Sequence, residues 1–221
     1  AGDADEAVPV RPVRRHFQIV DNIVAAAAKV LGERLADLRF LRQNHQPFGV
    51  FGEAKLDQMV KPNDVVAIKI HCGEWNNTAY LRPVYARALA DRNKELGGRP
   101  FVCDTTTSTY SPFGSRATEL DILLTAERNG YSSATLGCPF ICADGFIGTS
   151  DFRVDLPEGY LLKEAYVAQA IAAADVLIAL THFKGHPMGV IGGALKNLGI
   201  GAQSKRGKLN VHMGGHPNYG L

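Results

Sequence analysis

Asp64-Val-Val-Ala-Ile-Lys-Ile70 is the clearest strand of the sequence, a short run rich in β-branched residues that follows the turn signal Pro62-Asn63. Residues 100–103 and 176–180 are two further short apolar runs. Runs of this length and composition are typical of strands that are buried on both faces. The sequence therefore predicts three buried strands.

Helical patterns alternate with these strands. Residues 78–96 predict a helix that Gly97-Gly98 stops, and residues 116–129 predict one that ends at a glycine. An Ala-rich run over residues 164–174 predicts a helix before the third strand. Because such alternation indicates βαβ units, we expect an α/β fold: a mainly parallel sheet with helices on both faces and Rossmann-like strand–helix alternation.

Three segments organise the chain. Residues 1–59 are expected to form an N-terminal arm and helical lead-in, with a helix over residues 16–38. Residues 60–212 form the α/β domain, in which residues 152–162 resemble a hairpin. Residues 213–221 are a C-terminal tail, either complete or the start of a further segment.

Composition limits the partners and the compartment. A net charge of +2 over 221 residues gives no bulk electrostatic reason to expect nucleic acid or a membrane surface as partner. No stretch approaches the roughly 20 apolar residues that a membrane span requires. Four scattered cysteines do not make a disulfide framework, which favours a cytoplasmic location. Because the chain begins with Ala1 rather than Met, export after signal-peptide cleavage is the alternative.

Polar residues follow all three predicted strands, where open α/β sheets bind their ligands. His71 follows the first strand, Asp104 and Thr105 follow the second, and His182 and His186 follow the third. An imidazole in such a position serves as a general base or as a metal ligand. We therefore predict His71, His182, His186 and Asp104 as catalytic residues, with Thr105 as a cofactor-binding residue.

The glycine-rich segment over residues 181–201 is the most specific part of the sequence. Gly192-Gly193 is expected to open a short helix whose unpaired N–H groups face an anion such as phosphate, with Lys196 one turn inside it. It is neither a P-loop nor a dinucleotide fingerprint, and a loop packed against a neighbour is the alternative. The predicted cofactor-binding residues are Lys184, Gly192, Gly193, Lys196, Asn197, Lys208, Thr105 and Asp144. Asp144 is either a turn residue or a carboxylate facing the cleft.

Several blocks together resemble the family called "domain of unknown function 362" over residues 60–212. They are Lys69-Ile-His-Cys-Gly-Glu74, Tyr80-Leu-Arg-Pro83, Cys103-Asp-Thr-Thr-Thr107, Ala143-Asp-Gly145 and His182-Phe-Lys-Gly-His186 followed by Gly-Gly-Ala-Leu-Lys-Asn197. Members of that family are often followed by a ferredoxin-like segment with four-iron–four-sulfur motifs. The resemblance thus implies such a cluster where a following segment or a partner supplies it, and it implies no general activity.

A more distant similarity concerns nickel-pincer lactate racemases. Lys196 follows His186 by ten residues and precedes His212 by sixteen, a spacing that is similar to theirs, although Leu198-Gly199 replaces their Pro-Gly. The resemblance implies that Lys196 holds a nucleotide-derived cofactor, that His212 is the metal ligand and that His186 transfers protons. Nickel or iron is the metal expected.

Two classes of function remain open. One is an enzyme, an oxidoreductase or an isomerase, that binds a metal and/or a nucleotide-derived anionic cofactor for redox, proton or hydride transfer on a small molecule. The other is a non-catalytic docking or carrier module for an iron–sulfur redox partner. In that alternative a basic loop at Lys205, Arg206 and Lys208 recognises an acidic surface.

Overall fold

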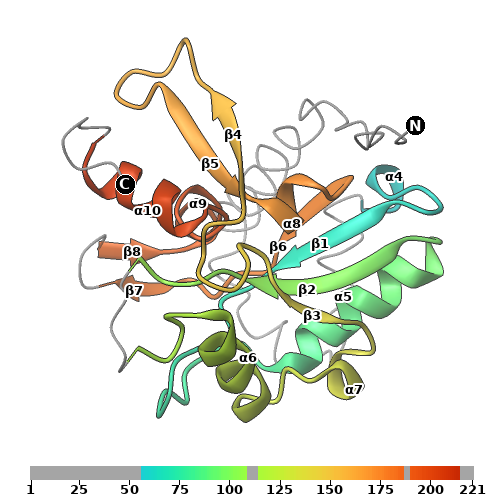
Figure 1. Cartoon of the computed structure of the whole chain (residues 1–221). Coiled ribbons are helices and arrows are strands. Elements are labelled where there is room, and N and C mark those ends of the chain that lie inside the picture. Colours follow the sequence, from blue (N-terminus) through green and yellow to red (C-terminus); the bar gives the residue numbers. More distant parts are fainter. Residues whose placement is uncertain (1–55, 109–113, 187–189, 215–221) are drawn as a thin grey trace, which may run out of the picture.

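The computed structural model describes residues 56–108, 114–186 and 190–214 (Figure 1). The helix predicted over residues 16–38 lies outside these described residues. None of the described helices is long and apolar enough to cross a membrane.

Four parallel strands form the central sheet in the order β3-β2-β1-β6. Their bounds are β1 (Val65–Lys69), β2 (Arg99–Asp104), β3 (Phe140–Cys142) and β6 (Val176–Ala179). Strand β1 is central, with Val66 opposite Pro100 of β2 on one side and Val176 of β6 on the other. The α/β prediction and its three strands are confirmed, whereas the short edge strand β3 was not predicted.

Side chains that alternate along the strands build two apolar layers, one on each face of the sheet. Val66, Ile68 and Ile178 pack on the face covered by α5 (Pro83–Glu95), α6 (Glu119–Arg128) and α7 (Ser133–Leu136). Ala67 and Leu177 pack on the other face, with side chains from α8 (Gln169–Ala172) and α9 (Ala194–Gly199). Figure 1 shows these two groups of helices below and above the sheet. Both faces are thus covered, as expected.

Local capping sets the starts of the two long helices. Helix α5 begins at Pro83 rather than at residue 78, because a proline disfavours helical geometry in the residue before it and suits the first helical turn. Helix α6 begins after Thr118, whose side chain accepts from the Asp121 backbone while the Asp121 carboxylate accepts from the Thr118 backbone. Both predicted helices exist, and both start later than predicted.

The predicted helix over residues 164–174 is wrong over its first half. Strand β5 (Glu164–Ala168) pairs antiparallel with β4 (Asp151–Asp155), and α8 occupies Gln169–Ala172 alone. The predicted hairpin exists, but its second strand lies at residues 164–168 instead of residues 160–162. Alanine's helix propensity is a weak preference, and here the five-residue ladder with β4 outweighs it.

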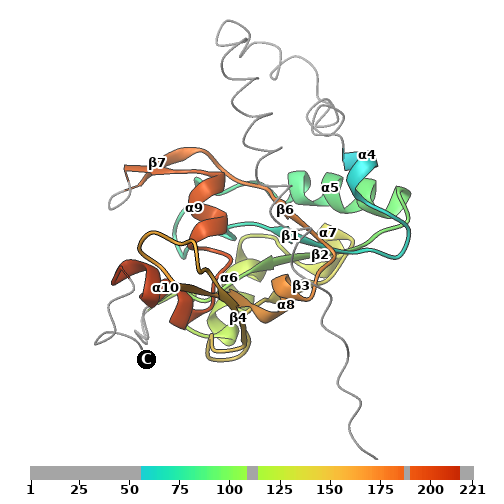
Figure 2. The same ribbon diagram turned by 90° about the horizontal axis from the view of Figure 1, so that it is seen from above.

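Most of the remaining elements gather at one end of the sheet. Strands β7 (Lys184–His186) and β8 (Val190–Gly192) form a second hairpin, and α10 (Lys205–His212) follows α9. A short helix α4 (Leu56–Met59) precedes β1. Figures 1 and 2 both show the β7–β8 hairpin, α9 and α10 beside the end at which β1 and β6 finish.

The strand order creates a switch point between β1 and β6. The chain adds β2 and β3 on one side of β1 and then crosses to place β6 on the other side. Connections that leave neighbouring parallel strands in opposite directions open a crevice outside their carboxyl ends, where α/β proteins bind ligands. The fold thus places residues 70–74 and 180–186 at the two sides of one crevice.

Candidate functional site

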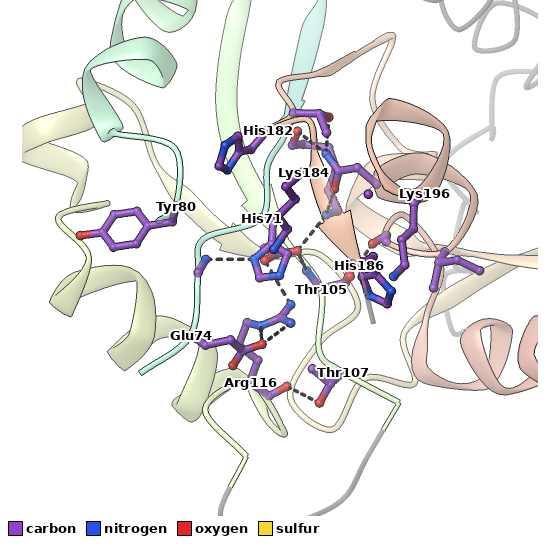
Figure 3. A pocket seen from close by; sticks show the side chains of 18 of the residues that line it. His71, Glu74, Tyr80, Thr105, Thr107, Arg116, His182, Lys184, His186 and Lys196 are labelled. Atoms are coloured by element: carbon purple, nitrogen blue, oxygen red, sulfur yellow. Dashed lines mark hydrogen bonds and ion pairs between the residues drawn. The ribbon is translucent and has the colours of Figure 1, made fainter. Parts of the chain in front are cut away.

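A cavity of about 370 Å³ occupies this crevice (Figure 3). Every predicted site residue except Asp144 lines it. These lining residues are His71, Asp104, Thr105, His182, Lys184, His186, Gly192, Gly193, Lys196, Asn197, Lys208 and His212. Residues from four separate segments therefore meet at one place, and the roles predicted for them stay predictions.

A buried ion pair forms the floor of the cavity. The Lys69 ammonium lies 2.8 Å from the Asp104 carboxylate, and both side chains are at most 2% exposed. Asp104 also accepts from the backbone N–H groups of Cys72 and Thr105. Although burial acts the other way, Lys69 and Arg116 hold the pKa of Asp104 well below its usual value. Asp104 is therefore held as an anion by its neighbours, and its predicted catalytic role stays a prediction.

Arg116 extends this network across the cavity floor. Its guanidinium donates to Glu74 at 2.8 Å and lies 3.4 Å from Asp104. Burial raises the pKa of Glu74, but Arg116 outweighs burial and lowers it. Lys69, Glu74 and Arg116 were not among the site residues predicted from the sequence. Arg116 precedes α6 and follows no strand directly, so no strand-end rule points to it.

His71 is a neutral imidazole at the end of β1. Its Nδ1 accepts from the backbone N–H of Gly73 at 3.0 Å, which leaves the ring proton on Nε2. Burial and then the positive charge of Arg116 lower the pKa of His71 to about 4. Gly73 makes this turn with φ of +94°, where a side chain would also meet Asn129. His71 is therefore held as an N–H donor at neutral pH.

The opposite wall carries positive side chains from β7 and α9. Figure 3 shows Lys184 extending toward His71 and Lys196 toward His186, whereas His182 is exposed and lies apart. Within the described ranges, no carboxylate forms an ion pair with Lys184 or Lys196. Burial and the positive charges of Arg116 and Lys184 lower the pKa of Lys196. Burial and Lys196 likewise lower the pKa of His186.

Asn197 joins the two walls. Its side-chain oxygen accepts from Lys69 at 2.9 Å, and its amide donates to the Thr181 hydroxyl at 2.9 Å. As predicted, a short helix opens after Gly193, and it places Asn197 against β1. Gly201 lets the chain pass close beneath it, because a side chain there would lie 2.4 Å from the Asn197 carbonyl oxygen. The amide is thus already engaged in holding the walls at a fixed separation.

The predicted basic loop is wrong, because these residues belong to α10. Lys205 is fully buried and donates to the Ala117 carbonyl at 2.6 Å, while Arg206 pairs with Asp151 at 2.6 Å. Lys208 turns inward and donates to the Thr105 hydroxyl at 2.9 Å. Burial lowers the pKa of Lys208 to about 7. One ammonium of the expected surface patch therefore belongs to the cavity lining instead.

Asp144 is a structural carboxylate rather than a lining residue. It is completely buried and accepts from the backbone N–H of Thr106 at 2.9 Å and from its hydroxyl at 2.7 Å. These bonds fix the turn that follows β2. Asp144 therefore does not face the cavity, although it supports the segment that carries Thr105.

The donor set does not suit a metal held by the chain alone. Among the residues that the structure describes, no three His, Cys, Asp or Glu side chains converge as a metal site. The Nδ1 atom of His212 lies 2.7 Å from the Lys208 carbonyl oxygen, so its Nε2 faces away from that bond. His212 is one candidate ligand without partners of the usual kind, and the nickel or iron assigned to it stays a prediction.

The balance of charge characterises the cavity. Five lysine or arginine side chains and two carboxylates line it, all of them described residues. Both carboxylates are already paired with Lys69 or Arg116. The sheet and the cavity together define an α/β protein with a positively charged cleft at its switch point.

The family model described as "Domain of unknown function (DUF362)" matches residues 66–219. This match covers more than half of the chain, and the protein belongs to that family. No curated protein and no solved structure gives a significant match.

Proposed function

We propose that the cleft binds a phosphate-bearing, nucleotide-derived small-molecule anion, that His186 takes up a proton from the bound molecule and that His71 stabilises the charge that forms. The observation that carries this proposal is the pair Lys184 and Lys196, which face the cavity without a carboxylate partner among the described residues. Two ammonium groups that repel one another gain most from an anion placed between them. An enzyme of the oxidoreductase or isomerase class fits this arrangement best.

His71 and His186 have complementary parts in the proposed reaction. The neutral His71 ring offers its Nε2 proton as a hydrogen bond to developing negative charge, without becoming an imidazolium. His186 lies beside Lys196, and its lowered pKa keeps it unprotonated at neutral pH. An unprotonated imidazole is competent as a general base. His186 would therefore take up a proton while His71 stabilises the charge that forms.

The metal and iron–sulfur parts of the hypothesis gain no support from the described residues. A nickel or iron ion on His212 would need ligands that the converging side chains do not supply, so we derive no step through it. The docking alternative depended on an exposed basic loop, but Lys205 and Lys208 are buried. An anion bound by the cleft is the function that the geometry favours.

Ligand titration by calorimetry tests the proposal, with inorganic phosphate, AMP and nicotinic acid mononucleotide as probes. We expect a nucleotide to bind more tightly than phosphate and the affinity to fall as salt rises. Lys196→Gln should weaken binding about 10-fold or more, because a charge-assisted hydrogen bond contributes about 1.5–3 kcal/mol. Lys61→Gln removes the same charge from an exposed site near the opposite ends of the strands and should change nothing.

Two results would contradict this function. The first is that none of the three probes binds at low salt, and the second is that Lys196→Gln and Lys61→Gln bind them equally well. Native mass spectrometry of freshly purified protein provides an independent readout. A retained nucleotide-sized ligand that Lys196→Gln loses would support the proposal.

A further inference from the structure

A second and larger cavity, of about 870 Å³, adjoins the charged cleft. Both cavities are lined by the same four residues, His186, Lys196, Ile200 and His212. The larger cavity runs from these residues between the β4–β5 hairpin, α8 and α9. We call it the apolar groove.

The lining of the groove is apolar beyond this shared junction. One side is formed by Val154, Leu156 and Leu162 of the β4–β5 hairpin, and the other by Ile191, Leu195 and Leu198. Apart from His186, Lys196 and His212 at the junction, Gln203 is the single polar side chain among the described lining. Its amide donates to the Gly199 carbonyl at 2.5 Å, so it is already engaged. The groove therefore offers an apolar ligand a long wall and no competing polar site.

The two cavities differ sharply in charge along one continuous path. At one end stand Lys184 and Lys196, which attract an anion. From Lys196 onward the path is lined by aliphatic side chains, some of which are large and exposed: Leu195 is 69% exposed and Ile191 is 55% exposed. Exposed apolar surface of this kind gains free energy when a ligand removes it from water. A ligand with a charged head at Lys196 and an apolar chain beyond it would match both the charged cleft and the apolar groove.

We propose that the ligand of the cleft is an amphipathic anion, with a phosphate or carboxylate head at Lys184 and Lys196 and an extended aliphatic chain in the apolar groove. This inference rests on the anion-binding part of the proposed function, and it names the apolar chain that the bound anion carries. The proposed occupant of the groove is thus a small molecule and not a protein segment.

Calorimetric titration with unbranched alkyl phosphates, from ethyl to decyl and below their micelle concentrations, tests the proposal. Each methylene that enters an apolar site contributes about 0.8 kcal/mol, so Kd should fall about fourfold per added carbon until the groove is filled. Decyltrimethylammonium carries a chain of the same length on a cation. It should bind at least 100-fold more weakly than decyl phosphate.

Two neighbouring alanines give a matched pair of variants. Ala172 lines the groove, whereas Ala173 is exposed and lines neither described cavity. Ala172→Trp should abolish the gain with chain length and leave ethyl phosphate binding unchanged, while Ala173→Trp should behave like the natural chain. Should Ala172→Trp fail to fold, Leu195→Gln replaces an exposed side chain and should reduce the affinity for decyl phosphate several-fold.

The outcomes separate this inference from the function on which it rests. If all alkyl phosphates bind with the same Kd, the cleft binds anions and the amphipathic ligand is excluded. That result is also the one expected if residues 1–55 or a partner protein cover the groove. If decyltrimethylammonium binds as well as decyl phosphate, the link between head charge and chain is wrong. If neither ethyl phosphate nor any nucleotide binds, the proposed function itself fails.

Discussion

The two walls of the cleft hold the same kinds of charged group in opposite electrostatic situations. The floor of the cavity, with Lys69 and Arg116 beside the ends of β1 and β2, is called the β1–β2 wall here. Both side chains are nearly buried, and each faces a carboxylate within 3.4 Å. On the β7–α9 wall, Lys184 and Lys196 are partly exposed and have no carboxylate partner among the described residues. A charge that its neighbours neutralise maintains the shape of a site, whereas one without such neighbours is available to a ligand.

Because of this difference, substitutions on the two walls should affect different properties of the protein. Removing one member of a buried pair leaves the other charge in a medium that solvates it poorly, which destabilises the fold. Removing a partly exposed lysine that is surrounded by other cations relieves repulsion instead. The β1–β2 wall should therefore respond to mutation through stability, and the β7–α9 wall through ligand affinity.

Asp104→Asn should have the largest effect. The variant leaves Lys69 buried without its counter-charge and removes an acceptor from Arg116, which should cost about 3–5 kcal/mol in free energy of unfolding. Urea denaturation measures this cost. Asp155→Asn is the control, because Asp155 is 74% exposed and its partner Arg153 is 62% exposed, and water screens an ion pair at such a site. Equal costs at the two positions would mean that the β1–β2 wall is not held by its ion pairs.

The double variant Lys69→Met with Asp104→Leu sharpens this test. Removing both charges of a buried pair leaves no uncompensated charge, so the double variant should be more stable than Asp104→Asn. A double variant that is less stable than Asp104→Asn would show that the apolar pair cannot replace the hydrogen bonds to Cys72 and Asn197.

The sequence predicted which strand-end residues line the cleft better than which residues neutralise one another there. His71 and His186 were placed at one cavity because strand ends in a parallel sheet converge on one edge, and that rule needs no knowledge of packing. Arg116 was missed, because its place in the site depends on how the loop before α6 folds back over β2. The inward direction of Lys205 and Lys208 was missed for a related reason: a basic run reads as exposed until the helix that carries it is docked.

The same limit explains the error at residues 164–168. Local composition favoured a helix, but the antiparallel partner β4 lies earlier in the chain and its pairing is a tertiary contact. The apolar groove beside this hairpin was likewise invisible in the sequence. Its lining comes from eight separate elements, β4 to β8 and α8 to α10, and no pattern within any one of them shows that they meet.

His71→Gln should remove a pH dependence of stability. The pKa of His71 is about 4 in the folded protein and near 6.5 when unfolded, so between these values the unfolded chain binds the extra proton. Stability is therefore fully present above pH 6.5 and falls as the pH drops toward 4, by up to about 3 kcal/mol. Urea denaturation from pH 7 to 4.5 should show a shallower decline in the variant.

Other charged groups lie near His71, so the measurement has to separate their titration from that of His71. Arg116, Lys69 and Lys184 lower its pKa, while Asp104 raises it. Arg116 also lowers the pKa of Glu74, so the carboxylates lose their contribution at more acid pH than the His71 window. A difference between the natural chain and His71→Gln that grows from pH 6.5 to 5 belongs to His71. The same pH slope in both proteins would mean that this imidazole is not held neutral.

Lys184→Gln with Lys196→Gln should have the smallest effect on stability and the largest on ligand affinity. Neither ammonium forms an ion pair with a described carboxylate, and burial together with the positive charges of Arg116 and Lys184 lowers the pKa of Lys196. Substitution away from buried partners changes stability by about 0.5 kcal/mol or less, and here the relief of repulsion favours a small increase. Thermal unfolding without added anion should give a Tm equal to or slightly above that of the natural chain.

The direction of this change in Tm tests whether the two walls differ in how their charges are neutralised. If the double variant unfolds at a clearly lower temperature, the two lysines stabilise the fold through contacts of their own. The β7–α9 wall would then be compensated like the β1–β2 wall, and its positive charge would carry no implication for a ligand. If Tm is unchanged while phosphate no longer raises it, the two ammonium groups contribute binding free energy alone. Lys69→Gln, measured in parallel, should lower Tm strongly, because it leaves Asp104 buried beside fewer positive charges.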